Sequence, residues 1–344
     1  MLVFLLIGAV TAVSSYVGVW LIRQWAIRRQ ILDVPNERSS HEQPTPIGGG
    51  LAIVVITAVI WLAASWYLQI DSWLQIILPL LGACMIAAVG WVDDMQPLSS
   101  KIRFGVHILA AVFAIVSFGA WDQIAIPFGG TVSLSWLGYI VTFFWLVGLT
   151  NAYNFMDGID GLAGGQGVVA GLGWLILGQL IGNDLVSVLG LGLAAANLGF
   201  LGHNWPPARI FMGDVGSGYL GYLFALLPMM VLNDAYPSLI PGALCLWPFI
   251  FDTGFTFCRR LIKRENVFAA HRSHLYQRLV INGYSHRFVT LLYIGLALIG
   301  VILGIGWVLE IQGIVWITFL VMPLLCLGLY FFVVGQEKRL LNHD

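Results

Sequence analysis

Long runs of apolar residues fill most of this chain of 344 residues and constrain its fold more than any other feature. Hydrophobic residues make up 59% of the sequence and charged residues only 10%. A soluble domain carries about 25% charged residues, and a helix that crosses a membrane needs about 20 mainly apolar residues. The composition therefore excludes a soluble, disordered or coiled-coil protein and indicates a protein that crosses a membrane many times.

About eleven segments are expected to form transmembrane helices. They cover residues 2–22, 48–68, 73–91, 104–120, 135–149, 162–182, 185–202, 216–232, 239–258, 287–307 and 314–334. The first segment is also compatible with a signal peptide, but it lacks a basic start and a small-residue cleavage site, so we expect a retained span. The predicted fold is an all-α polytopic membrane protein, with residues 1–344 forming a single integral membrane domain.

The charges sort by side of the membrane. If the N-terminus lies outside, all 16 Lys and Arg residues fall on the inner side. The outside connections then carry only acidic residues, namely Asp71, Asp122, Asp184, Asp234 and Glu310. Basic loops stay in the cytoplasm, so we expect a periplasmic N-terminus and a cytoplasmic C-terminus. In the longest outside loop, near residues 122–134, apolar residues alternate with other residues on both sides of a Gly-Gly turn. This pattern predicts a small β-hairpin.

Other compositional features narrow the partners. The net charge is −1, which indicates no nucleic-acid partner. The four cysteines stand singly in apolar runs, so neither a disulfide framework nor a zinc site is expected.

Polar residues gather in five segments on the inner side, covering residues 23–47, 92–103, 150–161, 203–215 and 259–286. Charges beside membrane spans are costly and are usually functional. The first segment leads into Pro44-Thr-Pro-Ile-Gly-Gly-Gly50, a rigid and tightly turned approach to the second span. It is either an ordinary loop or one in which Arg38 and His41 bind an anionic headgroup.

An acidic pair, Asp93 and Asp94, ends the third span. Neighbours on a helix point about 100° apart, so the two carboxylates are expected to have different functions. The C-terminal end of a helix is already negative. The pair therefore predicts a bound cation or a nearby lysine, for which Lys101 is the candidate.

Three oxygen-bearing side chains follow at intervals of three residues: Asn154, Asp157 and Asp160. If this segment is helical, they line one face, and such ligands suit Mg²⁺ or Mn²⁺. Asp214 stands among glycines at the start of the eighth span, where backbone N–H groups are expected to favour phosphate.

The last polar segment holds His271, Arg272 and His274, which are expected to bind a diphosphate, whereas its other basic residues are equally compatible with a stripe on anionic lipid. Carboxylates for a cation and basic groups for phosphates thus meet where a lipid phosphate and a soluble nucleotide would meet. The residues predict phosphoryl transfer to a lipid carrier. A transporter or lipid flippase is the alternative, but transporters place ionisable residues near the bilayer midplane, and here they lie at span ends.

Five motifs carry a family resemblance in this order: PTPIGGG, GWVDD, NFMDGIDGLAGG, NWPPARIFMGDVGSGYLG and HRSH. Together they resemble the polyprenyl-phosphate N-acetylhexosamine-1-phosphate transferases. That superfamily includes the enzymes that initiate O-antigen, enterobacterial common antigen and teichoic acid linkage units, and the phospho-MurNAc-pentapeptide translocase of peptidoglycan synthesis. The HRSH form resembles the O-antigen-initiating members, because the translocase typically has three consecutive histidines there.

The resemblance implies a role for each motif. Asp214 matches a metal ligand, with Asp157 near the metal, and Asp93 and Asp94 match an acidic pair of which one is proposed to deprotonate the lipid phosphate. The remaining matches are the nucleotide- and metal-side residues Asn154, Asp157 and Asp160, the active-site Asn204, and the sugar- or diphosphate-binding residues His271, Arg272 and His274. The position matching Lys101 varies within the family.

The implied reaction transfers an N-acetylhexosamine-1-phosphate from a UDP-sugar to undecaprenyl phosphate and releases UMP. Its cofactor is Mg²⁺, or else Mn²⁺. The implied location is the bacterial inner membrane, with the active site facing the cytoplasm, and the implied partners are the UDP-N-acetylhexosamine, undecaprenyl phosphate and the lipid bilayer. A homodimer is a possible assembly, and the sequence does not decide between it and other oligomeric states. Phospho-MurNAc-pentapeptide transfer is the alternative activity.

Overall fold

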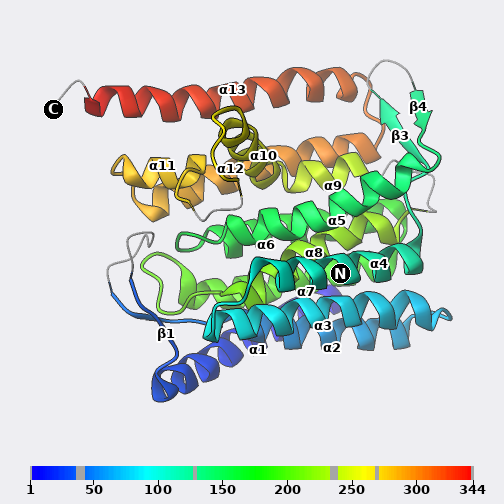
Figure 1. Ribbon diagram of the computed structural model, residues 1–344. Coiled ribbons are helices and arrows are strands. Elements are labelled where there is room, and N and C mark those ends of the chain that lie inside the picture. The colour runs from blue at the N-terminus through cyan, green and yellow to red at the C-terminus, as the bar shows by residue number, and fades with distance from the viewer. Residues whose placement is uncertain (1, 36–42, 127–129, 233–238, 268–270, 342–344) are drawn as a thin grey trace.

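Helices form at all eleven segments where the apolar runs predict them, in a computed structural model that describes residues 2–35, 43–126, 130–232, 239–267 and 271–341 (Figure 1). The helices that precede the turn at residues 205–213 are α1 (Leu2–Arg29), α2 (Gly50–Tyr67), α3 (Trp73–Met95), α4 (Ser100–Phe118), α5 (Leu137–Phe155), α6 (Leu162–Ile181) and α7 (Asp184–Asn204). Those after it are α8 (Asp214–Met230), α9 (Leu239–Cys245), α10 (Trp247–Ile262), α11 (Leu275–Ile281), α12 (His286–Val308) and α13 (Ile314–Leu341). The prediction of an all-α polytopic membrane protein is confirmed.

Eight of the described helices are long and apolar enough to cross a membrane, or nine if the bent pair α9 and α10 forms one span. The sequence predicted about eleven. The two that fall short are α5, which carries Asn151 and Asn154, and α8, which has only 17 residues. Nearly all of α8 is buried among its neighbours. A helix enclosed by protein does not need the length or apolar surface that lipid contact requires.

The segment 239–258 departs from the single straight span that was predicted. It forms two helices, α9 and α10, with a bend of 85° between them. Pro248 stands at the start of α10. Proline has no N–H to donate to the preceding turn, so it begins helices rather than continuing them. As a result α10 leaves the direction of the bundle and lies against α11 and α12 (Figure 1).

Two short antiparallel ribbons accompany the helices. The predicted hairpin is present as β3 (Gln123–Ile126) paired with β4 (Gly130–Ser133), in the register Gln123↔Ser133. The second ribbon was not predicted: β1 (Leu32–Asp33) pairs with β2 (Thr45–Pro46) just before α2.

Small residues let α6 and α7 pack closely against each other. A Cβ atom added to Gly171 would lie 2.5 Å from the backbone nitrogen of Ala194, and one added to Gly190 would lie 2.5 Å from that of Leu175. Membrane helices approach this closely only where side chains are small. The glycine-rich sequence of α6 therefore serves helix packing.

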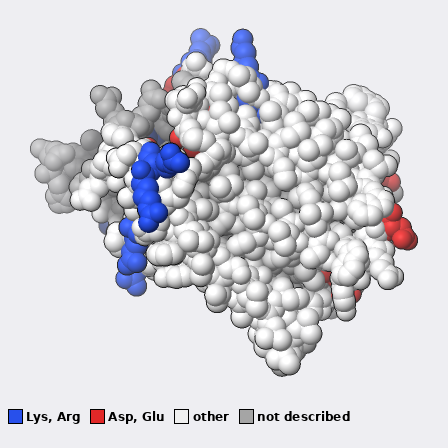
Figure 2. Space-filling view, turned by 90° about the horizontal axis from the view of Figure 1, so that it is seen from below, with Lys and Arg blue, Asp and Glu red and all other residues white. Residues whose placement is uncertain are grey.

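Charge divides the molecule along the helix axes. On the face shown in Figure 2, Lys and Arg side chains gather at the left and upper edges, the right-hand end shows only acidic ones, and the broad surface between is uncharged. The basic residues at the ends of α1, α10 and α13 belong to the same end of the bundle as the start of α4 (Figure 1). An uncharged belt between charged ends is the surface that a bilayer requires, so the chain is a multi-pass membrane protein.

Replacing Gly171 with alanine tests this packing. Because the new methyl group meets backbone rather than a flexible side chain, the variant should lose about 1–3 kcal/mol of stability. Thermal unfolding of the detergent-solubilised protein measures the loss as a lower Tm. The matched control is Gly148→Ala on α5, where an added Cβ meets nothing within 4 Å; it should hold or slightly raise the Tm. Equal Tm values for the two variants would contradict the packing described here.

Candidate functional site

Four helix ends meet at one end of the bundle and bring together polar residues from distant parts of the chain. Arg103 on α4 is the residue that joins them. Its Nη1 lies 2.6 Å from Oδ2 of Asp93 on α3 and 3.1 Å from Oδ2 of Asp214 on α8. The predicted partner of the acidic pair, Lys101, is not the one that the structure selects. Residues two apart on a helix point about 200° apart, and Lys101 is exposed.

Asp94 faces a different partner from Asp93, as the helical geometry predicted. Its carboxylate accepts hydrogen bonds from the backbone N–H groups of Asp214 at 2.8 Å and Val215 at 3.2 Å. These are the first two N–H groups of α8, and the next two bond to the carbonyl of Gly213. The prediction that this helix start offers free N–H groups to a phosphate is therefore wrong, because Asp94 already occupies the position that an anion would take.

Asn154, near the end of α5, fixes the other oxygen of Asp214. Its Nδ2 donates to Oδ1 of Asp214 at 2.8 Å and to the hydroxyl of Ser217 at 2.9 Å. Asp214 thus has an amide on one oxygen and a guanidinium on the other. Both contacts restrict its rotamer, so the carboxylate is held in place before any ligand binds.

The motif PTPIGGG holds the turn that precedes Asp214. The carbonyl of Pro46 accepts from Phe211 N at 2.8 Å, and the N–H groups of Gly49 and Gly50 donate to the carbonyls of Phe211 and Met212, each at 2.9 Å. Backbones approach this closely because a Cβ on Gly50 would lie 2.4 Å from the Cα of Gly216. The motif therefore holds this turn through backbone hydrogen bonds. Arg38 and His41, which were predicted to bind an anionic headgroup, lie outside the described residues.

The loop between α5 and α6 carries Asp157 and Asp160, and it is not helical as the spacing allowed. The helix ends at Phe155, and the loop turns at Gly161, whose φ is +77°. The two carboxylates have different neighbours. Oδ2 of Asp160 accepts from Ala208 N at 3.0 Å and lies 3.4 Å from Nδ1 of His286.

Asp157 stays on the side of Asp214. Burial, followed by the negative charge of Asp214, raises the pKa of the Asp157 carboxyl well above its ordinary value, with smaller effects from two other carboxylates. Its side chain accepts no hydrogen bond within the described part of the chain. A carboxylate that is crowded by like charges and lacks a donor is suited to a cation.

The donor set therefore fits a hard divalent cation, for which carboxylate and amide oxygens are the preferred ligands. Asp214 and Asp157 are the residues that would hold it. In the described residues, however, no three His, Cys, Asp or Glu side chains converge closely enough to hold a metal ion as they stand. Arg103 lies between Asp93 and Asp214 instead, so the metal remains a prediction.

Asn204 is buried and ties two loops together. It accepts from Gly161 N at 2.8 Å and donates to the carbonyl of Ile210 at 2.9 Å. Both ends of the amide are thus engaged with backbone, and its predicted contact with substrate stays a prediction.

The HRSH motif lies beside the loop of Asp157. The ring of His274 is 6.2 Å from that of Phe155, and the two motif histidines, His271 and His274, have ring centroids 5.0 Å apart. Burial, and then the neighbouring His274 and arginines, lowers the pKa of His271 to about 4. His271 is therefore neutral near pH 7. Arg272 belongs to the same turn, between them.

Two residues of this region were missed from the sequence. Arg103 was not distinguishable from Lys101, since both stand in the first turn of one helix. Asp252 of α10 is wholly buried and contacts His274. A lone carboxylate within the predicted span 239–258 was a signal for it, because ionisable residues inside spans are usually functional.

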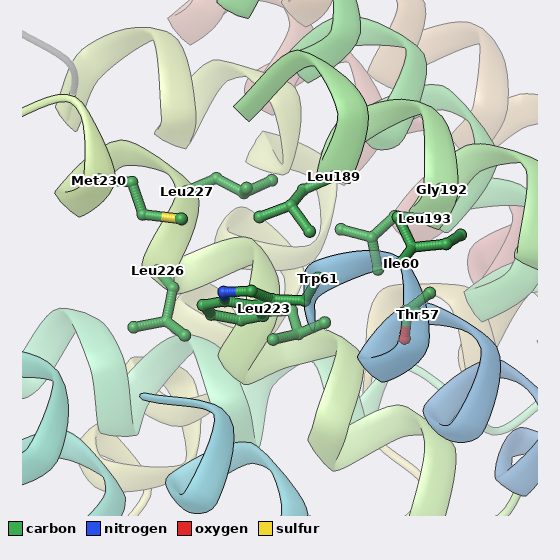
Figure 3. A pocket seen from close by; sticks show the side chains of 10 residues that line it. All are labelled: Thr57, Ile60, Trp61, Leu189, Gly192, Leu193, Leu223, Leu226, Leu227 and Met230. Carbon is green, nitrogen blue, oxygen red and sulfur yellow. The ribbon is translucent and has the colours of Figure 1, made fainter. Parts of the chain in front are cut away.

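The apolar cavity shown in Figure 3 is not part of this site. It lies between α2, α7 and α8, and its lining is Thr57, Ile60, Trp61, Leu189, Gly192, Leu193, Leu223, Leu226, Leu227 and Met230. The hydroxyl of Thr57 is engaged by the carbonyl of Ile53 and by Tyr219. The cavity offers no charged group, so it is a gap in helix packing.

Replacing Arg103 with methionine tests whether its positive charge offsets the negative charges of Asp93 and Asp214. The variant leaves Asp93 and Asp214 without their cation, and because the guanidinium is about one third exposed we expect a loss of only about 1–2 kcal/mol. Thermal unfolding in EDTA measures it, and added Mg²⁺ should raise the Tm of the variant more than that of the wild type. Lys101→Met is the matched control and should behave like the wild type. An Arg103→Met variant that Mg²⁺ stabilises no more than the wild type would contradict this role.

Comparisons with known proteins identify the family of the chain. The model of glycosyl transferase family 4 matches residues 76–232. A probable undecaprenyl-phosphate N-acetylglucosaminyl 1-phosphate transferase of Bacillus subtilis is 32% identical over 326 residues, which are 94% of this chain and 88% of that protein. A decaprenyl-phosphate N-acetylglucosaminephosphotransferase of Mycolicibacterium smegmatis is 32% identical over 83% of this chain and 78% of its own length. A phospho-N-acetylmuramoyl-pentapeptide-transferase of Latilactobacillus sakei is 34% identical over 55% of this chain and 62% of its own length. The chain therefore belongs to glycosyl transferase family 4, as its motifs predicted, and is a phosphoglycosyltransferase.

Proposed function

We propose that this protein transfers an N-acetylhexosamine-1-phosphate from a UDP-sugar to undecaprenyl phosphate, releasing UMP and forming undecaprenyl-diphospho-sugar. The observation that carries the proposal is the meeting of Asp93, Arg103 and Asp214 at the basic end of a membrane bundle, with Asp157 beside them. Relatives that match most of the chain are named for such transfers to undecaprenyl or decaprenyl phosphate. Both of those names specify N-acetylglucosamine, which makes UDP-N-acetylglucosamine the foremost donor.

The chemistry joins two phosphates. An oxygen of the lipid phosphate attacks the β-phosphorus of the UDP-sugar, a new P–O–P link forms, and the bond to the α-phosphate breaks so that UMP leaves. Asp214 and Asp157 are the residues that would hold Mg²⁺, which would supply charge neutralisation for the diphosphate. Arg103 adds positive charge next to the same carboxylates, and His271, Arg272 and His274 would bind the donor.

Asp93 or Asp94 is the candidate base for the lipid phosphate. Both carboxylates are engaged in the structure: Asp94 accepts from the backbone of α8, and Asp93 accepts from Leu98 N and Arg103. A phosphomonoester has a second pKa of about 6, so the acceptor is already largely dianionic at neutral pH. Proton removal should therefore matter less than charge neutralisation.

The proposed location is the bacterial inner membrane with the site facing the cytoplasm. The site lies at the end of the bundle where α1 and α13 carry their basic last turns, and basic ends face the cytoplasm. Initiation of O-antigen synthesis is the proposed pathway step on the strength of the HRSH form alone. The structure holds one chain, so a homodimer stays a prediction.

Phospho-MurNAc-pentapeptide transfer is the second candidate. It is favoured by the match to the transferase of Latilactobacillus sakei, but that match covers only 55% of this chain. The single HRSH motif in place of consecutive histidines argues against it.

The purified protein in liposomes with undecaprenyl phosphate tests the proposal against a panel of UDP-sugars. We expect UDP-N-acetylglucosamine to yield equal amounts of UMP and lipid-linked sugar, EDTA to abolish both, and Mg²⁺ to restore them. UDP-MurNAc-pentapeptide should be a poor donor. Full turnover in EDTA would reject the metal, and turnover of only the pentapeptide donor would establish the second candidate.

Replacing Asp214 with asparagine tests the ranking of the carboxylates. The change removes the charge that Arg103 and Asn154 hold in place, and we expect kcat to fall by about 100-fold or more. Asp93→Asn and Asp94→Asn should each cost less, once rates are normalised to folded protein, since Asp94→Asn also weakens the start of α8. The reverse order in the same transfer assay would overturn this ranking.

A further inference from the structure

A second buried carboxylate lies outside the cluster of Asp93 and Asp214. Asp252 on α10 has no exposed surface, yet five groups donate to it. The donors are Leu275 N at 2.8 Å, Tyr276 N at 3.0 Å, Tyr293 Oη at 2.6 Å, Thr256 Oγ1 at 3.2 Å and His274 Nδ1 at 3.3 Å. A wholly buried carboxylate needs such a set of donors to remain in place.

Three of these donors are consecutive residues. His274 is the last residue of the HRSH motif, and Leu275 and Tyr276 are the first two residues of α11. One carboxylate on α10 therefore fastens both the end of the motif and the helix that follows it. Within α11, Gln277 Oε1 accepts from His274 N at 3.3 Å as part of a capping box. The two N–H groups that open the helix are bonded by a side chain more than twenty residues upstream.

The contact decides which nitrogen of His274 is left for a ligand. A ring nitrogen that faces a carboxylate carries a proton, so Nδ1 is the donor to Asp252. Within the described residues Nε2 of His274 makes no hydrogen bond. The ring is thus oriented by one nitrogen and presents the other.

The same anchor sets the distance between the motif and the carboxylates. The hydroxyl of Tyr276 donates to the carbonyl of Phe155 at 2.9 Å. A Cβ on Gly158 would lie 2.1 Å from that hydroxyl, so α11 sits directly on the loop of Asp157. Asp252 therefore connects the HRSH motif to the acidic cluster through Tyr276.

We propose that Asp252 is a positioning residue that holds His274 with its proton on Nδ1, so that Nε2 is the nitrogen presented to the UDP-sugar. This inference rests on the proposed function, since it assigns the donor substrate to that atom. It predicts that Asp252 acts on recognition of the UDP-sugar and leaves recognition of the lipid acceptor unchanged.

Kinetics of Asp252→Asn provide one test. An amide keeps the size of the side chain but cannot accept hydrogen bonds on both of its ends. We expect the KM for the UDP-sugar to rise about tenfold or more, with the KM for undecaprenyl phosphate unchanged. The matched control is Thr256→Val, which removes a donor to the same oxygen without touching the motif, and its KM for the UDP-sugar should stay within about twofold of the wild type. Equal rises in both KM values, or no rise, would overturn the proposal.

The tautomer of His274 provides a second test that does not depend on turnover. In ¹⁵N-histidine NMR spectra, the signal that disappears in His274→Gln identifies this ring. We expect Nδ1 to be protonated in the wild type and the tautomer to change or become mixed in Asp252→Asn. A wild-type ring protonated only on Nε2 overturns the proposal, even where Asp252→Asn does not fold. In that case His274→Gln supplies the kinetic test, with a rise in the KM for the UDP-sugar of about tenfold expected and an unchanged KM contradicting it.

The two tests separate this inference from the proposed function. If the wild type releases UMP from no UDP-sugar, the proposed function fails while the NMR tautomer still reports on the contact with Asp252. If the wild type is active and Asp252→Asn keeps the wild-type KM and tautomer, only the role of Asp252 fails.

Discussion

Repulsion between carboxylates at the edge of an apolar bundle is the constraint on which the rest of this structure depends. Asp93, Asp157 and Asp214 come from α3, the α5–α6 loop and α8, and burial there weakens the solvent screening that separates like charges in water. The fold compensates with one guanidinium and one amide: Arg103 bonds Asp93 and Asp214, and Asn154 bonds Asp214. Asp157 alone keeps an uncompensated carboxylate, which places the remaining need for positive charge at a defined point.

Two aspartates in this protein also bind the backbone N–H groups of another helix. Asp94 caps the start of α8, and Asp252 caps the start of α11, each accepting two consecutive N–H groups. In both cases the carboxylate belongs to a different helix, so it fixes one element against another as well as satisfying its N–H groups. Helix ends are therefore joined to one another at the side of the molecule where the motifs lie.

Hydrogen bonds between motifs also connect segments that are far apart in the chain. PTPIGGG pairs with the backbone before Asp214, and Tyr276 joins α11 to the carbonyl of Phe155. A phosphoglycosyltransferase must hold a donor and an acceptor in register during transfer. Anchoring each motif to a neighbouring motif, rather than to a flexible loop of its own, provides that register.

The sequence alone determined the class of the fold, the positions of the helices and the end of the bundle that carries the motifs, because apolar length and charge sorting are properties of local composition. It also showed that Asp93 and Asp94 face different partners, since that follows from helical geometry. Only the tertiary structure decided that Arg103 rather than Lys101 meets Asp93, that Asp160 accepts from Ala208 N, and that Asp252 contacts His274. These choices depend on which helix end lies against which, and on where a helix stops, as at Phe155 and at the bend before Pro248. Contacts between residues of different helices and loops are set by packing in three dimensions, and no spacing along the chain encodes them.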